Sequence, residues 1–254
     1  MNNASVNISL RWIAMGMSVL PVFACAFCVL YTAMTRTTEV YAASMADCPY
    51  SSSFPTVSVS IGPWEPQRLV WISAMMINMP MRFMITMVYP TVWPHGMLRS
   101  ILTPLLVAES FCTAAVSIFH VQSIAGEGIH ALCFTCWSFA TGGVMIVTIA
   151  LHRLYRRDRM GRKAVIFGFF LLFALICASS HPISTQYCIY WVYALFCLSE
   201  YSLMVTTAVF WTSVLSSLSD QFDRISLKLS MSSNEGILPS FTSSSAWIVD
   251  DSKL

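Results

Sequence analysis

Six long apolar stretches constrain the fold of this chain more than any other feature of its sequence. A helix of about 20 residues crosses the ~30 Å hydrocarbon core of a bilayer, where the backbone must satisfy its own hydrogen bonds within a helix or a closed barrel. The stretches lack the period-two alternation of barrel strands. We therefore expect an all-α membrane protein, a polytopic bundle of six transmembrane helices. The predicted spans are roughly residues 12–34, 69–90, 98–120, 129–151, 164–181 and 188–215.

The composition agrees with a surface that faces lipid. Charged residues make up 10% of the chain and hydrophobic residues 56%, whereas soluble domains carry about 25% charged residues. The net charge of +2 is too small for a nucleic-acid-binding surface, so we expect no nucleic-acid partner. Most of the nine cysteines lie inside the apolar stretches, where a thiol behaves as a small hydrophobic side chain.

The loop between the fourth and fifth spans sets the predicted orientation. Residues 152–163 contain six of the fourteen Lys and Arg residues of the chain. Because cytosolic loops of membrane proteins carry an excess of these residues, we expect this loop in the cytosol. Counting spans outward from it predicts that both termini are cytosolic. The segments 35–68, 121–128 and 182–187 are then expected to face the lumen or the exterior.

The chain is expected to form one transmembrane domain followed by a tail. Residues 1–218 form the six-helix transmembrane domain, with a first luminal loop at about 35–68. Residues 219–254 are rich in serine and lack helical periodicity. Such a segment has too few apolar residues to form a core, so we expect a disordered cytosolic tail.

Three ionisable residues interrupt the apolar spans: Arg82 in the second, Glu109 in the third and Glu200 in the sixth. Each costs at least ~2.5–3.5 kcal/mol at the bilayer centre. A rise of ~1.5 Å per residue places all three near mid-depth. We expect a buried cluster in which Arg82 bridges one or both carboxylates. Such a cluster either holds three helices together or forms a polar cavity that receives a lipid headgroup or hydroxyl.

Two cysteines and three histidines lie on the predicted luminal side. Cys48 lies in the first luminal loop and Cys188 at the mouth of the sixth span. In an oxidising compartment they either form a disulfide that fixes this loop to the bundle or stay as free thiols. His120, His130 and His181 lie at the ends of spans. No close spacing such as HxxxH supports zinc, so no metal site is expected.

Several short motifs occur in the order and spacing of a known family. The first luminal loop and the second span contain Phe54-Pro55-Thr56-Val57-Ser58, Ile61-Gly62, Pro66-Gln67-Arg68, Trp71 and Arg82-Phe83. Further along the chain follow Glu109, Ile129-His130, Cys188, Tyr193 and Glu200-Tyr201. Over roughly residues 10–215, the chain resembles the Frag/DRAM/Sfk-type multi-pass membrane proteins. Within that family it is most similar to the members that act after GPI attachment to proteins.

The resemblance implies lipid remodelling of GPI-anchored proteins in the membrane of the Golgi apparatus or the endoplasmic reticulum. The step is reacylation of the sn-2 position of lyso-GPI with a saturated fatty acid. The implied partners are membrane lipids, GPI-anchored proteins and other remodelling enzymes. An acyl-CoA or a phospholipid would donate the acyl chain, and no cofactor is expected within the protein.

Candidate site residues follow from the buried charges together with the resemblance. Those expected to act in catalysis are Glu109, Glu200 and His130. Those expected to bind substrate are Arg68, Arg82, Tyr193 and Tyr201. The disulfide candidates are Cys48 and Cys188.

The sequence is compatible with more than one function. The chain is either an acyltransferase embedded in the membrane or a non-enzymatic, lipid-binding scaffold that regulates a remodelling acyltransferase. A transporter fits less well, because the chain shows no internal repeat and no pair of interrupted spans. The sequence leaves open which of these functions applies, and it also leaves open the acyl donor and the oligomeric state.

Overall fold

A computed structural model describes residues 5–8, 10–36, 38, 55–62, 64–119, 126–155, 160–218 and 227–230. Its long helices are α1 (Leu10–Thr35), α4 (Gln67–Val88), α5 (Met97–Ile118), α6 (Gly126–Tyr155), α7 (Met160–Tyr187) and α8 (Tyr190–Ser217). The shorter elements are strand β1 (Ser5–Ile8), helix α3 (Val57–Ser60), the 3-10 helix η1 (Tyr89–Val92) and strand β2 (Leu227–Ser230).

Six helices of the described part of the chain are long enough and apolar enough to cross a membrane. They coincide with the six predicted spans, which confirms the predicted all-α, polytopic architecture. The largest difference in a boundary is at the end of α7, which continues through the segment 182–187, predicted as a luminal loop. Pro182 cannot donate a backbone hydrogen bond there. Just beyond it, the side chains of Ser184 and Thr185 donate to the carbonyl oxygen of His181, at 2.8 and 3.0 Å.

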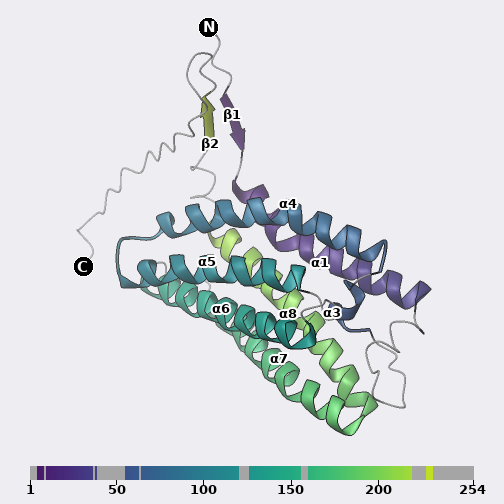
Figure 1. Ribbon diagram of the computed structural model, residues 1–254. Helices are drawn as coiled ribbons and strands as arrows, with labels where there is room; N and C mark the ends of the chain where they lie inside the picture. Colours follow the sequence, from purple (N-terminus) through teal and green to yellow (C-terminus); the bar gives the residue numbers. More distant parts are fainter. Residues whose placement is uncertain are drawn as a thin grey trace.

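The helices form an elongated bundle in which α7 and α8 make one antiparallel pair and α1 lies beside α4 (Figure 1). Strands β1 and β2 pair in an antiparallel register with Ser5 opposite Ser230, and they lie at one end of the bundle (Figure 1). The N-terminal segment and the start of the tail are therefore on the same side, as an even number of crossings requires. Strand β2 belongs to the segment predicted as a disordered tail, most of which lies outside the described residues.

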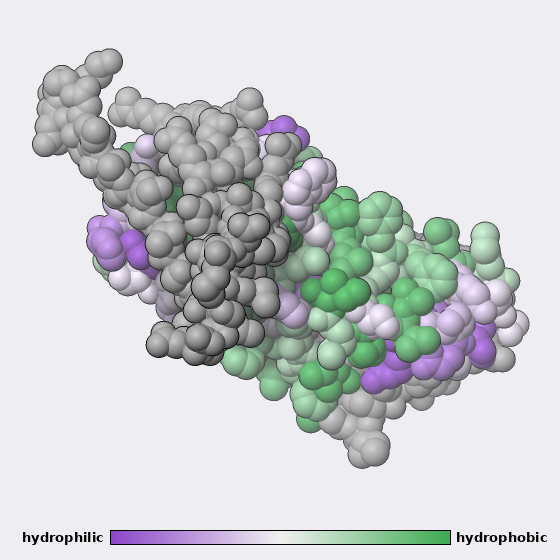
Figure 2. Space-filling view, turned by 90° about the horizontal axis from the view of Figure 1, so that it is seen from above, coloured by the Kyte–Doolittle hydropathy of each residue, from purple (hydrophilic) through white to green (hydrophobic). Residues whose placement is uncertain are grey.

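The surface of the bundle is apolar where a bilayer would contact it. Large hydrophobic side chains such as Phe23, Met76 and Phe111 are strongly exposed. Figure 2 shows hydrophobic side chains between more hydrophilic ends of the molecule. Small residues allow close helix contacts inside, because a Cβ atom at Gly16 would lie 3.0 Å from the sulfur of Met81. Close packing at small residues is typical of helix association in membranes, where lipid is as apolar as the helices.

The segment 55–62, which belongs to the predicted first luminal loop, packs into the bundle. Val57, Val59 and Ile61 are buried, and α3 packs against α1 and α8. The side chain of Thr56 caps α3 by accepting a hydrogen bond from the backbone nitrogen of Val59, at 3.0 Å. A short, interrupted segment is tolerated inside a membrane bundle where protein surrounds it and satisfies its backbone hydrogen bonds.

Glycosylation tests the predicted orientation of the bundle. If the N-terminus is cytosolic, the sequons Asn3-Ala4-Ser5 and Asn7-Ile8-Ser9 remain unmodified, because the transferase acts in the lumen. We expect endoglycosidase treatment to leave the electrophoretic mobility of the expressed protein unchanged. The control is Tyr50→Asn, which creates a sequon in the predicted luminal loop and is expected to add one glycan. A glycan on the unsubstituted protein would reverse the orientation.

Candidate functional site

Glu200, in α8, is the centre of a polar site inside the bundle. Its side chain is buried, with 5% of the residue exposed. One carboxylate oxygen accepts a hydrogen bond from the backbone nitrogen of Val57, at 2.9 Å. The other lies 3.0 Å from the hydroxyl oxygen of Ser58. Both partners belong to α3, so Glu200 fastens the segment 55–62 to the middle of the bundle.

His130, near the beginning of α6, continues the same line of polar groups. Its Nε2 lies 2.9 Å from the hydroxyl oxygen of Ser58. Its Nδ1 lies 2.6 Å from the carbonyl oxygen of Phe119. Because a carbonyl oxygen can only accept, Nδ1 carries the hydrogen, and Nε2 of the neutral ring is an acceptor. Glu200, Ser58 and His130, which we call the polar line, therefore form a continuous chain of hydrogen bonds across α8, α3 and α6.

Arg82 and Glu109 form a separate buried ion pair between α4 and α5. The exposed fractions of the two residues are 7% and 1%. Nε of Arg82 also donates to the side-chain oxygen of Asn78, at 3.3 Å, and the Asn78 amide donates to the carbonyl oxygen of Met17 in α1, at 2.7 Å. The sequence left open whether Arg82 bridges one carboxylate or two. It pairs with Glu109, whereas Glu200 is held by α3.

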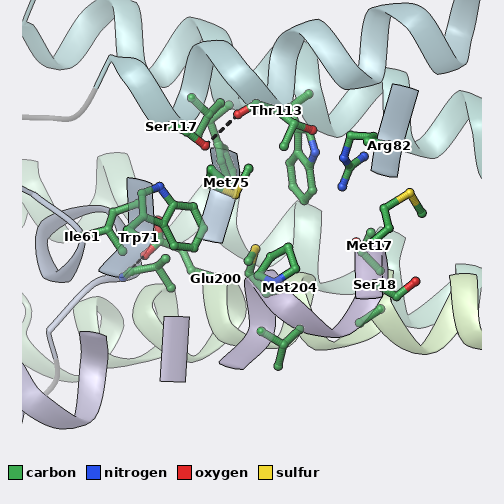
Figure 3. A pocket seen from close by; sticks show the side chains of 18 of the residues that line it. Met17, Ser18, Ile61, Trp71, Met75, Arg82, Thr113, Ser117, Glu200 and Met204 are labelled. Carbon is green, nitrogen blue, oxygen red and sulfur yellow. Dashed lines mark hydrogen bonds between the residues drawn. The ribbon is translucent and has the colours of Figure 1, made fainter. Parts of the chain in front are cut away.

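A small cavity of about 80 Å³ lies between the ion pair and the polar line. Arg82, Ser58 and Glu200 all line it. Figure 3 shows Arg82 and Glu200 at different places on its wall, with Met75 and Met204 between them in this view. The volume suits a few water molecules or a hydroxyl-bearing group, because a cavity needs at least ~10–15 Å³ to hold one water molecule.

A wide cavity of about 760 Å³ lies on the other side of the polar line. Its size is within the ~300–1,000 Å³ that is usual for ligand pockets. The polar groups on its wall include His130, Ser58, Glu200 and Tyr193, whereas most of the wall consists of apolar side chains of α6 and α7. Ser58, Glu200 and Phe134 line both cavities, so Ser58 and Glu200 lie at the boundary between them, and His130 lies on the side of the wide cavity.

The wide cavity reaches the outer surface of the bundle between α6 and α7. Phe139 of α6 and Leu175 of α7 line it, although they are 77% and 69% exposed. Ile146 and Leu171 share both properties. In a bilayer these side chains contact hydrocarbon, so the wide cavity borders the acyl chains of the lipid.

The other predicted binding residues, Tyr193, Tyr201 and Arg68, have different surroundings. Tyr193 is buried and lines the wide cavity. The hydroxyl of Tyr201 donates to the carbonyl oxygen of Pro55, so this tyrosine holds the segment 55–62 in place. Arg68 lies in the first turn of α4 and lines neither cavity. Within the described part of the chain, its Nη1 is buried without a hydrogen-bond partner.

The remaining sequence candidates are only partly described. Cys188 is disulfide-bonded, but Cys48, its predicted partner, lies outside the described residues, so the pairing stays a prediction. His120 lies outside them as well, and His181 lines the wide cavity. Among the described residues, no group of three His, Cys, Asp or Glu side chains is arranged to hold a metal ion.

Ser58 is the site residue that the sequence did not single out by its chemistry. It belongs to the run Phe54–Ser58, which carries part of the family resemblance. A signal is nevertheless present, because Thr56 and Ser58 alternate with Val57 and Val59 just before the second span. The apolar residues of this run indicate burial against protein, but the run does not reveal the contacts of Ser58 with Glu200 and His130.

Comparisons with known proteins show a family and a relative that the chain resembles. The family model of the Frag1/DRAM/Sfk1/Cwh43P N-terminal domain matches residues 10–220, a range that includes the whole polar line and both cavities. The chain is also similar to the protein named Acyltransferase PGAP2 of Xenopus tropicalis. The two are 27% identical over 200 residues, which cover 73% of this chain and 78% of the relative. No solved structure matches the chain.

Proposed function

The chain belongs to the Frag1/DRAM/Sfk1/Cwh43P N-terminal domain family, and from this premise we propose that it transfers a saturated acyl chain to the sn-2 hydroxyl of lyso-GPI anchors. The transfer takes place in membranes of the secretory pathway. The observation that carries the proposal is the polar line on the wall of a wide apolar cavity that reaches the lipid. The name of the similar protein, an acyltransferase, supports the reaction class.

The two cavities meet the different needs of an acyl transfer. The donor's chain needs apolar space, and the wide cavity between α6 and α7 supplies it. The reacting hydroxyl needs a base, and Nε2 of His130 faces Ser58 at the boundary between the cavities. A base positioned in this way contributes about 10²–10⁴-fold to a rate. The glycerol hydroxyl of lyso-GPI would approach at this boundary, where Glu200 and Ser58 provide hydrogen-bonding groups.

The net reaction is an exchange of one ester for another or of a thioester for an ester. The acyl donor is a phospholipid or an acyl-CoA. The hydroxyl oxygen of lyso-GPI becomes bonded to the acyl carbonyl carbon, and the donor's bond from that carbon to oxygen or sulfur breaks. The hydroxyl proton ends on the leaving group, so His130 is unchanged after each cycle.

Complementation of cells that lack GPI reacylation tests the proposal. The chain is expressed in these cells, and the sn-2 chain of a GPI-anchored reporter is identified by mass spectrometry. We expect saturated chains to return. Continued lyso-anchors, with the protein inserted at a normal level, would overturn the proposal. A purified protein that forms no product from lyso-GPI and either donor, yet restores the cells, would favour a scaffold that regulates another acyltransferase.

Filling the wide cavity is expected to change which acyl chains are used. Gly142 lines the cavity, and an added Cβ atom would lie 3.6 Å from Phe170, an ordinary contact. We expect Gly142→Leu to lower transfer of an 18-carbon chain about 10-fold or more relative to a 12-carbon chain, because lost methylene contacts are worth ~1–3 kcal/mol each. The measurement is a competition between the two donors. Gly168→Leu is the matched control, since a Cβ atom there meets nothing within 4 Å.

A further inference from the structure

We propose that Ser58 is a nucleophile that carries the acyl chain as a covalent ester between donor and acceptor. The inference rests on the proposed acyl transfer and deepens it, because it divides the reaction into two half-reactions. Ser58 lies where such a group is needed, on the boundary between the wide cavity and the small one. An intermediate bound there is accessible from both cavities without a movement of the serine.

The contacts of Ser58 are those of an activated serine. Its hydroxyl oxygen is 2.9 Å from Nε2 of His130, and Nδ1 of the same ring is held by the Phe119 carbonyl oxygen at 2.6 Å. In serine hydrolases a base within ~2.6–3.2 Å takes the hydroxyl proton, and a third group fixes the orientation and tautomer of the base. Here the carbonyl of Phe119 acts as the third group.

Other aliphatic hydroxyls on the wall of the wide cavity are engaged differently. Those of Thr135 and Ser138 donate to carbonyl oxygens one turn earlier in α6, at 2.8 and 2.9 Å. The hydroxyl of Thr56 accepts the capping hydrogen bond from α3. These contacts are with the backbone, which cannot accept a proton at neutral pH. Ser58 differs in that its hydroxyl contacts an imidazole nitrogen and a carboxylate.

The polar line holds one proton in addition to that of the serine. The contacts of Ser58 with Glu200 and with His130 are two hydrogen bonds, but a serine hydroxyl supplies only one hydrogen. The second hydrogen is therefore on Glu200 or on Nε2 of His130. When Glu200 holds it, Ser58 donates to Nε2, and the neutral imidazole is placed to remove the serine proton.

In the first half-reaction the donor is a phospholipid ester or an acyl thioester whose chain lies in the wide cavity. The Ser58 oxygen bonds to the acyl carbonyl carbon while the serine proton moves to Nε2 of His130. The bond from that carbon to the leaving oxygen or sulfur breaks. The leaving group takes the proton from Nε2 and departs as an alcohol or a thiol, and Ser58 keeps the acyl chain.

In the second half-reaction the sn-2 hydroxyl of lyso-GPI attacks the acyl-serine. Its proton moves to Nε2 of His130, and its oxygen bonds to the carbonyl carbon. The ester bond to Ser58 breaks, and the serine oxygen recovers the proton from Nε2. No electron leaves or enters the site in either step. Because acylation of Ser58 precedes the attack by lyso-GPI, we expect a donor to acylate the protein in the absence of any acceptor.

The test is acylation of the purified full-length protein in lipid nanodiscs by alkyne-tagged palmitoyl donors, without lyso-GPI. One arm supplies palmitoyl-CoA and a second supplies phosphatidylcholine, which identifies the donor class. Tandem mass spectrometry locates the tag. We expect it on Ser58 in the unsubstituted protein and not in Ser58→Ala. In Ser58→Cys we expect a thioester that neutral hydroxylamine releases. Added lyso-GPI is expected to discharge the tag within minutes.

Ser60→Ala is the matched control on the same short helix. Ser60 is fully buried, and its hydroxyl donates to the Thr56 carbonyl oxygen at 2.8 Å. We expect this variant to acquire the tag as the unsubstituted protein does. Ser58→Ala is expected to lower acyl transfer to lyso-GPI at least about 100-fold, the lower bound for loss of the activated group. If Ser58→Ala does not fold, the hydroxylamine release from Ser58→Cys decides the question.

The failure of this inference is distinct from the failure of the proposed function. If the protein reacylates lyso-GPI but Ser58 is never tagged, the transfer is direct, and the covalent role is overturned while the function stands. A tag on Ser58 that lyso-GPI does not discharge would support acylation of Ser58 and overturn lyso-GPI as the acceptor. A tag of equal yield in Ser58→Ala would place the acyl chain on another residue and overturn the inference.

Discussion

Replacement of Arg82 by leucine is expected to lower the free energy of unfolding by about 3–5 kcal/mol, the usual cost of removing one partner of a buried ion pair. Glu109, which is 1% exposed, would be left buried without its cationic partner. Asn78 would also lose the hydrogen bond from Nε of Arg82, although its amide would still reach Met17 in α1. The measurement is unfolding of the purified protein in mixed micelles with increasing SDS.

The double variant Arg82→Leu/Glu109→Leu separates charge from packing. Buried ion pairs that are replaced by apolar residues of similar volume often leave stability unchanged or increased. We therefore expect the double variant to recover most of the stability that Arg82→Leu loses. Arg153→Leu is the control for loss of a positive charge, because Arg153 is exposed at the end of α6. An Arg82→Leu variant as stable as the control would show that the pair contributes little.

This comparison also decides between the two interpretations of the buried charges that the sequence left open. Arg82 links α4 to α5 through Glu109 and to α1 through Asn78, which is the arrangement of an interhelical tie. A double variant that is stable and still transfers acyl chains would assign Glu109 a structural role. A stable double variant without activity would place the ion pair in substrate binding, through the small cavity that Arg82 lines.

The physics of the bilayer explains why much of the fold could be predicted from the sequence. A span must be about 20 apolar residues long, and this length requirement located all six helices. The high cost of an isolated charge in hydrocarbon likewise predicted that Arg82 has a carboxylate partner. Glu109 is the acidic residue of the next span in the chain, and neighbouring spans commonly pack together.

The partners of Glu200 could not be predicted in this way. They lie in α3, and Glu200 and Val57 are 143 positions apart in the sequence. Positive-inside counting places a loop on one side of the membrane but says nothing of how deeply it enters the bundle. The apolar residues Val57, Val59 and Ile61 indicate burial of the loop, but no periodicity connects it to α8.

The wide cavity depends on the separation of two helices, which the sequence does not encode locally. Residue patterns predict which face of α6 or α7 is apolar, but both the lipid-facing and the cavity-facing sides are apolar here. The hydropathy of Phe139 and Leu175 is therefore the same whether they contact lipid, the cavity or, as observed, both. Gly142 and Gly143 in mid-helix are a weak indication of close approach or open space on that face of α6.

Loss of the His130 imidazole is expected to lower the rate of acyl transfer by about 10²–10⁴-fold, the usual contribution of a general base. The ring is the group that accepts the hydroxyl proton in both proposed half-reactions. Its Nδ1 contact with Phe119 fixes it in that orientation. In His130→Ala the hydroxyl of Ser58 would keep only Glu200 as a partner. The measurement is the initial rate of transfer by purified protein, with donor and lyso-GPI both saturating.

His95→Ala is the matched control for this substitution, because His95 is exposed in the turn between η1 and α5 and lines neither cavity. Equal melting temperatures of His130→Ala and the control would show that the loss of rate is not a loss of fold. Free imidazole provides a second criterion, since a cavity of about 760 Å³ admits it beside Ser58. We expect imidazole to restore part of the rate in His130→Ala and to leave the control unchanged. A rate in His130→Ala within about threefold of the control would remove His130 from the chemistry, because even a weak general base contributes ~100-fold.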